Sequence, residues 1–154
     1  MKKTIIYLQM TALFLAAALQ GAVAAETPFQ GSFQAVEIPA VQFPIVSIAG
    51  SGAGIATQLG KFTMTYEAEV NLLTRVGIGS VEFIAANGDR LFADLLGQST
   101  PTATPNLISI VETVTITGGT GRFAGATGNL ISMRLKDQVT GNTSGLLDGT
   151  LDIH

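Results

Sequence analysis

The segment Lys61–Leu72 alternates between polar and apolar residues along its whole length. Side chains of an extended strand point to opposite faces in turn, so this pattern gives the segment one apolar face and one polar face. In a helix the same apolar residues would be scattered around the circumference. The segment is therefore predicted to be a half-buried β-strand, whose apolar face carries Phe62, Met64, Tyr66, Ala68, Val70 and Leu72.

The rest of the chain after residue 25 has the pattern of strands separated by turns, without long helical periodicity. The Asn87-Gly88 pair is the strongest short signal for a hairpin turn. The stretch from Gln98 to Asn106, which contains Pro101 and Pro105, is predicted to be an exposed loop. The other predicted strands are Phe29–Ile38, Pro44–Thr57, Val76–Ala86, Asp89–Gly97, Leu107–Thr117, Phe123–Lys136 and Ser144–Ile153.

These predicted strands, about eight in number, follow one another with short connections, and each has one apolar face. Such strands can form a sandwich or close into a barrel, and closure removes both exposed sheet edges. Eight strands enclose an interior that side chains fill or that holds one small ligand. The pattern favours an all-β, eight-stranded antiparallel up-and-down barrel over a sandwich. A membrane barrel is disfavoured because its apolar face would point outward.

The first 25 residues have the layout of a secretory signal. Lys2 and Lys3 precede an apolar stretch from Ile5 to Leu19, and small residues fill positions 22–25. The alternative is an uncleaved membrane anchor, which would need roughly 20 apolar residues and is disfavoured by the shorter stretch. We therefore expect a signal peptide at 1–25, a β-barrel domain at 26–154 and a secreted or periplasmic protein.

The composition excludes several kinds of chemistry. The chain has no Cys, and its one His is the last residue, His154. These counts exclude disulfides, a cysteine nucleophile and a His-based triad, and we expect neither a metal site nor a cofactor. The formal net charge is −3, and no run of Lys or Arg occurs after residue 25. We therefore expect no nucleic-acid partner and, after signal cleavage, no membrane partner.

One glycine-rich stretch carries a family resemblance. Residues 118–128, GGTGRFAGATG, resemble the GGTG-x-F-x-x-A-x-G signature of dirigent and allene oxide cyclase-like proteins. The TQLGKFT segment at 57–63 is similar to a T-H-L-G-x-F-T segment of exported bacterial relatives, with Gln58 in place of His. The LDGTL segment at 147–151 resembles their closing strand. Independently of the resemblance, Gly118, Gly119 and Gly121 are expected at positive φ in a turn, and Gly125 and Gly128 at a bend or bulge.

The resemblance implies an eight-stranded barrel of the calycin type, in agreement with the strand count. Family members include cyclases and proteins that steer the coupling of reactive small molecules, and they often form homo-oligomers. No catalytic residue of the family aligns with a position of this chain, so none is transferred.

Glu112 is the most informative single residue, because it shares a strand face with Ile110 and Val114. A lone carboxylate on an apolar face is costly unless it is paired, hydrogen-bonded or protonated. One hypothesis makes it a lumen carboxylate that polarises a ligand or acts as a general acid or base. The alternative places it near a rim, where it is hydrated or paired with an arginine.

The remaining candidates form a predicted apolar wall. Tyr66 is expected to have its ring in the core and its hydroxyl satisfied locally. Glu37 is expected at an exposed rim, because it lies close to Pro39 at a strand end. Ile131, Met133 and Leu135 are expected to point inward. The predicted ligand-binding residues are Phe33, Phe62, Met64, Tyr66, Phe83, Glu112 and Met133.

Three hypotheses on function follow. The first is an exported barrel that binds an apolar or amphipathic small molecule in its lumen, with Glu112 as a polar anchor. The second is a cyclase or isomerase that folds a reactive substrate in the same cavity, with Glu112 as the candidate catalytic residue. The third is a packed barrel without a cavity that acts through its surface or as a homo-oligomer. Whether the lumen is open separates the third hypothesis from the other two.

Overall fold

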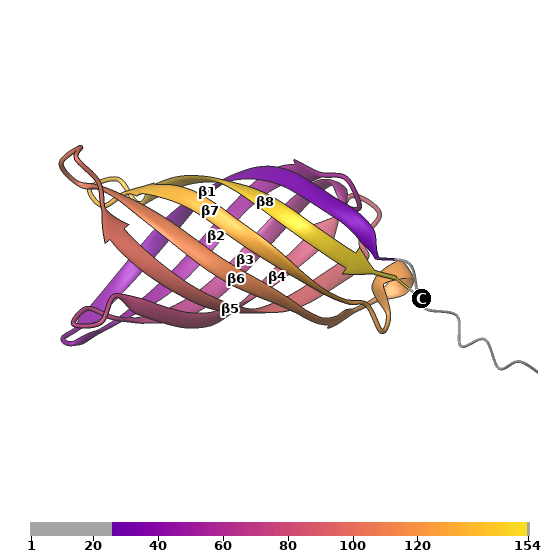
Figure 1. The fold of residues 1–154 in the computed structure, drawn as a ribbon, viewed down its shortest axis with the longest axis horizontal. Coiled ribbons are helices and arrows are strands. Elements are labelled where there is room, and N and C mark those ends of the chain that lie inside the picture. Colours follow the sequence, from indigo (N-terminus) through magenta and orange to yellow (C-terminus); the bar gives the residue numbers. More distant parts are fainter. Residues whose placement is uncertain (1–25, 154) are drawn as a thin grey trace, which may run out of the picture.

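The computed structural model describes residues 26–153, so the predicted signal peptide at 1–25 and His154 lie outside the described residues. Each strand pairs antiparallel with the next, and β1 also pairs with β8, which closes the barrel (Figure 1). This confirms the predicted eight-stranded up-and-down barrel. The strands are β1 (Thr27–Gln42), β2 (Ile45–Ala56), β3 (Gly60–Asn71), β4 (Val76–Ala85), β5 (Arg90–Pro101), β6 (Leu107–Gly119), β7 (Thr127–Asp137) and β8 (Asn142–Asp152).

The alternation that predicted a half-buried strand is present in β3. Phe62, Met64 and Tyr66 are buried, while Thr63 and Thr65 between them are exposed. The Asn87-Gly88 turn also joins β4 to β5 as predicted, with Gly88 at φ 89°. Within residues 26–153 no helix is long and apolar enough to cross a membrane.

The predicted strand Phe123–Lys136 is wrong in its start and in its inward face. Phe123 belongs to a short 3-10 helix, η1 (Gly121–Phe123), and β7 begins at Thr127. Met133 points outward and is 48% exposed. Ile131 and Leu135 on the same face are exposed to a similar extent. The opposite face of β7 is buried and carries Leu130, Ser132, Arg134 and Lys136.

The structure also differs from two smaller predictions. The segment from Gln98 to Asn106 is not all loop, because β5 continues to Pro101, which pairs with Ile108 of β6. In the glycine motif, Gly118 and Gly121 have positive φ as expected, whereas Gly119 is not among the glycines that do. Gly125 lies in a turn at φ 74°, which agrees with the predicted bend, whereas the irregularity in strand pairing occurs where Phe92 and Ala93 face Gly118 and Ile116.

The two ends of the barrel differ. Helix η1 lies at one end, beside the end of β8 (Figure 1). There Phe123, Phe29, Leu91 and Leu151 have no more than trace exposure, so side chains fill this end. The other end carries the β1–β2, β3–β4, β5–β6 and β7–β8 connections. The candidate site lies on the side of the lumen that faces these connections.

Candidate functional site

A cluster of charged side chains crosses the lumen between the filled end and the open end. Its charged groups come from three strands: Glu37 from β1, far away in sequence, and Glu112 and Arg134 with Lys136 from the neighbouring strands β6 and β7. All four residues are at most 9% exposed. Arg134 and Lys136 share a face of β7 because they are two residues apart. These four residues, together with Tyr66 of β3, are called the ion layer below.

Arg134 links the two carboxylates. Its Nε donates to Glu112 Oε2 at 3.0 Å and its Nη2 donates to Glu112 Oε1 at 2.8 Å. Its Nη1 donates to Glu37 Oε1, and the guanidinium carbon lies 5.6 Å from the centre of the Tyr66 ring. A planar guanidinium that binds one carboxylate through two donors holds it in a fixed orientation. Arg134 therefore fixes the geometry of the whole layer.

Glu37 is surrounded by donors. Its Oε1 also accepts from the Tyr66 hydroxyl at 2.7 Å, and its Oε2 is ion-paired with Lys136 Nζ. Burial alone would raise the pKa of the Glu37 carboxyl, but the positive charges of Arg134 and Lys136, with their hydrogen bonds, lower it below its ordinary value. Glu37 is therefore held as a carboxylate.

The pKa of Tyr66, in contrast, is raised above its ordinary value. Burial of the hydroxyl raises this pKa most, and the neighbouring Glu37 carboxylate raises it further. The pKa of Arg134 is raised as well, because its hydrogen bonds and ion pairs with Glu112 and Glu37 outweigh the opposing effect of burial. Both groups therefore stay protonated, and they serve as fixed hydrogen-bond donors.

Glycines on the neighbouring strands leave space for the ion layer. A Cβ at Gly97 of β5 would lie 2.7 Å from Glu112 Cγ, and one at Gly145 of β8 would lie 2.8 Å from Arg134 Cβ. A Cβ at Gly50 of β2 would overlap the Tyr66 ring. These contacts are closer than packed carbon atoms tolerate. Glycine at these positions lets three of the five side chains occupy the lumen.

An open cavity of about 400 Å³ lies above the ion layer and reaches the open end of the barrel. The layer forms its floor through Glu37, Glu112, Arg134 and Lys136. The mouth includes Val41, Leu72, Arg75 and Val139, which belong to the turns or adjoin them. The wall between floor and mouth is mainly apolar, with Ser99 among its polar members, and its apolar residues are Val46, Ile48, Ala68, Val70, Leu95, Ile108 and Ile110.

The lumen below the ion layer is packed. A void of only about 20 Å³ remains there, next to Tyr66, Glu112 and Arg134. Farther toward η1, the rings of Phe62 and Phe83 meet edge to face at 5.5 Å between centroids. A void of this size is far below the 300–1,000 Å³ of a small-molecule pocket. The space for a ligand is therefore confined to the open half.

The structure separates the predicted site residues into three groups. Glu112 does border the open cavity, and it is paired with an arginine as one hypothesis had it, although it lies inside the lumen and not at a rim. Phe33, Met64, Tyr66 and Phe83 line the small void below the layer, and Phe62 packs in the core. Met133 lies on the outer surface. Most of the predicted ligand wall is therefore core packing.

Glu37 corrects a prediction of the sequence. Its side chain has no exposed area, although its place near Pro39 had suggested a solvated rim. β1 continues past Pro39 to Gln42, so Glu37 lies well inside a strand and faces the lumen. The Tyr66 hydroxyl has a hydrogen-bond partner, as predicted, and this partner is the Glu37 carboxylate, 29 residues away in the chain.

Sequence reasoning missed Arg134 and Lys136. The apolar residues Ile131 and Met133 suggested the inward face of β7, whereas they lie on its outer face. One signal was present. A buried cation is one way to stabilise Glu112 on an apolar face, and Arg134 and Lys136 occupy one face of a predicted strand. The need to neutralise Glu112 therefore indicated that the face of β7 with Arg134 and Lys136 points into the lumen.

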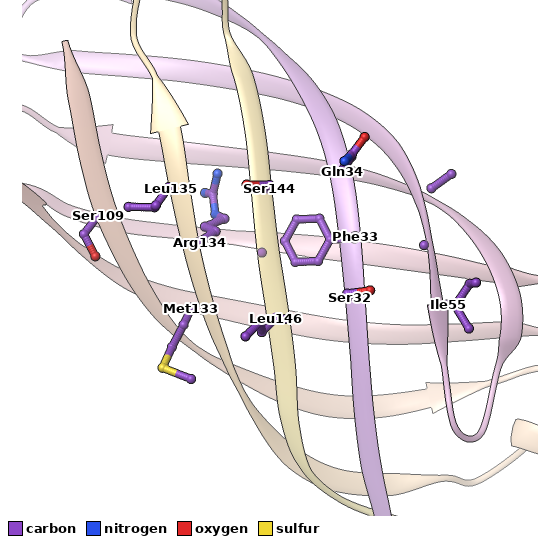
Figure 2. A pocket seen from close by; sticks show the side chains of 13 residues that line it. Ser32, Phe33, Gln34, Ile55, Ser109, Met133, Arg134, Leu135, Ser144 and Leu146 are labelled. Atoms are coloured by element: carbon purple, nitrogen blue, oxygen red, sulfur yellow. The ribbon is translucent and has the colours of Figure 1, made fainter. Parts of the chain in front are cut away.

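The outer wall carries a shallow groove across β1, β2, β6, β7 and β8 (Figure 2). Figure 2 shows Met133, Leu135 and Leu146 on neighbouring strands of this wall, and Met133 pairs with both Val111 and Leu146. All three labelled side chains are about half exposed. The groove is separate from the cavity, since it lies on the opposite side of the sheet.

Among residues 26–153 no group of three or more His, Cys, Asp or Glu side chains is arranged to hold a metal ion. A barrel of eight strands does not identify a family by itself, because one fold hosts many functions. The resemblance to dirigent and allene oxide cyclase-like proteins rests on short motifs and stays a prediction. No family model, curated protein or solved structure that was compared with the chain matches it.

Proposed function

We propose that this protein binds an apolar or amphipathic small molecule in the open half of its barrel. The observation that carries the proposal is the cavity of about 400 Å³ with a mainly apolar wall and a charged floor. Small-molecule sites combine such a wall with a few fixed polar groups that orient the ligand. The ion layer supplies those groups in a rigid arrangement, because each member is held by another.

The mouth of the cavity supports the same proposal. Exposed apolar side chains occur at three of the four connections of the open end: Phe43 in the β1–β2 turn, Leu73 in the β3–β4 turn and Val139 in the β7–β8 turn. Each is at least 70% exposed. Clusters of exposed apolar residues commonly mark sites of binding. Here they lie beside the opening through which an apolar ligand would pass.

The geometry supports binding better than a proton-transfer reaction. Both oxygens of Glu112 accept hydrogen bonds from Arg134, and Glu37 is held as a carboxylate by two cations. A general acid needs a proton to give, and a general base works best when its pKa is near the working pH. Glu37 has neither property, and both oxygens of Glu112 are already bound by Arg134, so the cyclase hypothesis receives no specific support from this site.

A first test blocks the cavity with a matched pair of variants. Ala68 lines the cavity wall on β3, whereas Ala49 on β2 points outward. We expect Ala68→Leu to weaken binding of the neutral fluorescent probe N-phenyl-1-naphthylamine at least tenfold, and Ala49→Leu to leave it unchanged. Circular dichroism and urea unfolding check that both variants fold. Equal probe binding by both variants would contradict the proposed site.

A second test searches for the natural ligand. The wild-type protein, purified under native conditions from its own host, is analysed by mass spectrometry for a retained small molecule. We expect a compound that is released by denaturation from the wild type and is absent from Ala68→Leu prepared in parallel. A compound retained equally by both proteins would place the binding site elsewhere.

A further inference from the structure

Two cations of the cavity floor have N–H donors to spare, since Arg134 uses three of its five within the ion layer. Lys136 is nearer the open end of β7 and is the more exposed of the two, with 11% of its side chain exposed against 6% for Arg134. Arg134 and the Tyr66 hydroxyl donate to Glu37 and Glu112 within the ion layer. An ammonium group has three donors. Within residues 26–153, the partner found for Lys136 Nζ is Glu37 Oε2. Lys136 borders the open cavity, so its remaining donors can reach a ligand.

The charges of the floor balance. Two carboxylates, Glu37 and Glu112, face two cations, Arg134 and Lys136. A ligand carboxylate at the floor would add a third negative charge to a buried layer whose two cations are already paired, since Arg75, the other cation that lines the cavity, lies at the mouth. An ammonium at the floor would add a third positive charge. A buried charge without a partner is costly. A carbonyl or hydroxyl oxygen accepts a hydrogen bond and leaves the balance unchanged.

From these two observations we propose that the ligand is an uncharged amphipathic molecule whose carbonyl or hydroxyl oxygen accepts a hydrogen bond from Lys136 Nζ. Its apolar body then lies along the wall formed by Val46, Ile48, Val70 and Ile110, toward the mouth. This inference rests on the proposed function, since it names the class of ligand for the same cavity. It assigns Lys136 as the ligand-binding donor.

The class of ligand is tested by competition against N-phenyl-1-naphthylamine with four compounds that share a ten-carbon skeleton: 2-decanone, 1-decanol, decanoate and decylammonium, at pH 7.5 and below their aggregation limits. We expect the ketone and the alcohol to displace the probe at concentrations at least tenfold lower than the two ions. Decanoate or decylammonium competing as well as the ketone overturns the inference but leaves the proposed function standing. An absence of probe binding to the wild type overturns both.

The role of Lys136 is tested with Glu37→Gln/Lys136→Met, which removes one charge of each sign and so keeps the layer neutral. A hydrogen bond to a charged donor is typically worth a tenfold or greater change in affinity. We expect the variant to bind 2-decanone at least tenfold more weakly and naphthalene, which has no acceptor oxygen, as the wild type does. Unchanged ketone affinity overturns the assignment. The matched control is Glu82→Gln/Arg90→Met, which removes an exposed ion pair of the outer wall.

A spectroscopic measurement on the wild type keeps the assignment testable if the double variant does not fold. The infrared carbonyl band of bound 2-decanone is expected at a lower frequency than in hexane, because a hydrogen bond to an ammonium weakens the C=O bond. A band at the hexane frequency overturns the assignment.

Discussion

Glu37 is the residue on which the charged floor depends most. Its carboxylate contacts Tyr66, Arg134 and Lys136 at once and has no exposed area. Removing one partner of a buried ion pair is costly because the other charge is left unpaired. The three contacts therefore make the stability of the barrel depend on the ionised form of one side chain.

The lowered pKa of Glu37 predicts loss of stability in acid. Its value in the folded protein lies below the ordinary 4.5, so the carboxylate favours folding above about pH 4.5, and this contribution falls as pH drops through the folded value. We expect urea unfolding between pH 6 and 3 to show a smaller loss of stability for Glu37→Gln/Lys136→Met than for the wild type. Parallel curves for the two proteins would refute this role. Glu69→Gln, a change on the exposed face of β3, is the control.

Arg134 gives a second prediction at the same scale. Arg134→Met leaves Glu37 and Glu112 buried without the cation that joins them. We expect the free energy of unfolding in urea at pH 7 to fall by about 3–5 kcal/mol. In Arg90→Met, which removes a pair whose arginine is 52% exposed, we expect a loss of about 1 kcal/mol or less. Similar losses for both variants would argue against a special role for the buried arginine.

At the scale of the element, β2 has the small inward residues that β3 requires. Gly50 pairs with Tyr66, and its missing side chain leaves room for the Tyr66 ring. Gly52 and Gly54 follow on the same face of β2. A strand whose glycines contribute no side chains to the lumen is thus covered by the large side chains of its neighbours. The consequence is that a single methyl group on β2 reaches the ion layer.

Gly50→Ala is therefore expected to be destabilising, even though alanine suits a strand better than glycine does. The added methyl group would displace the Tyr66 ring and lengthen its hydrogen bond to Glu37. We expect a loss of about 1–3 kcal/mol in urea unfolding. Ser51→Ala changes the exposed face of the same strand and is expected to be neutral. A Gly50→Ala variant as stable as the wild type would show that the ring can shift freely.

Elements also show what the sequence predicts and where it misleads. The inward faces of β3 and β6 were predicted correctly, because their outer faces carry Thr and Glu and the two faces therefore differ strongly in polarity. On β7 the contrast is reversed, since Met133 is exposed while Arg134 is buried. The apolar residues on the outer face of β7 therefore led to the wrong prediction of its inward face. The partners of Arg134 lie 22 and 97 residues away, so only the closed barrel brings the ion layer together.

At the scale of the whole molecule, the barrel has a packed half and an open half. Phe123 and Leu91 are fully buried at the η1 end, whereas Val41 and Val139 are about 70% exposed at the other. Strand count and closure were predictable from the alternating pattern and the spacing of turns. The difference between the halves was not, because it depends on how the large side chains are distributed along the barrel axis.

This division predicts uneven protection of backbone amides. Hydrogen bonds surrounded by packed side chains open less often than those near mobile turns. We expect hydrogen–deuterium exchange to be slowest in the η1 half, at Leu130 and Leu151, and faster near the mouth, at Val70 and Gly77. Addition of 2-decanone is expected to slow exchange near the mouth only. Uniform protection along β3 and β7 would contradict the two-part description.

The packed half of the barrel closes the inner end of the cavity, so within residues 26–153 the cavity has its opening at the β1–β2, β3–β4 and β7–β8 turns. Under the proposed function, a ligand and the water that it displaces would both pass through this opening. On the same proposal, a ligand that enters with its oxygen first would leave with its apolar end first, so its orientation would be set on entry. Its residence time would then depend on movement of the turns at the mouth.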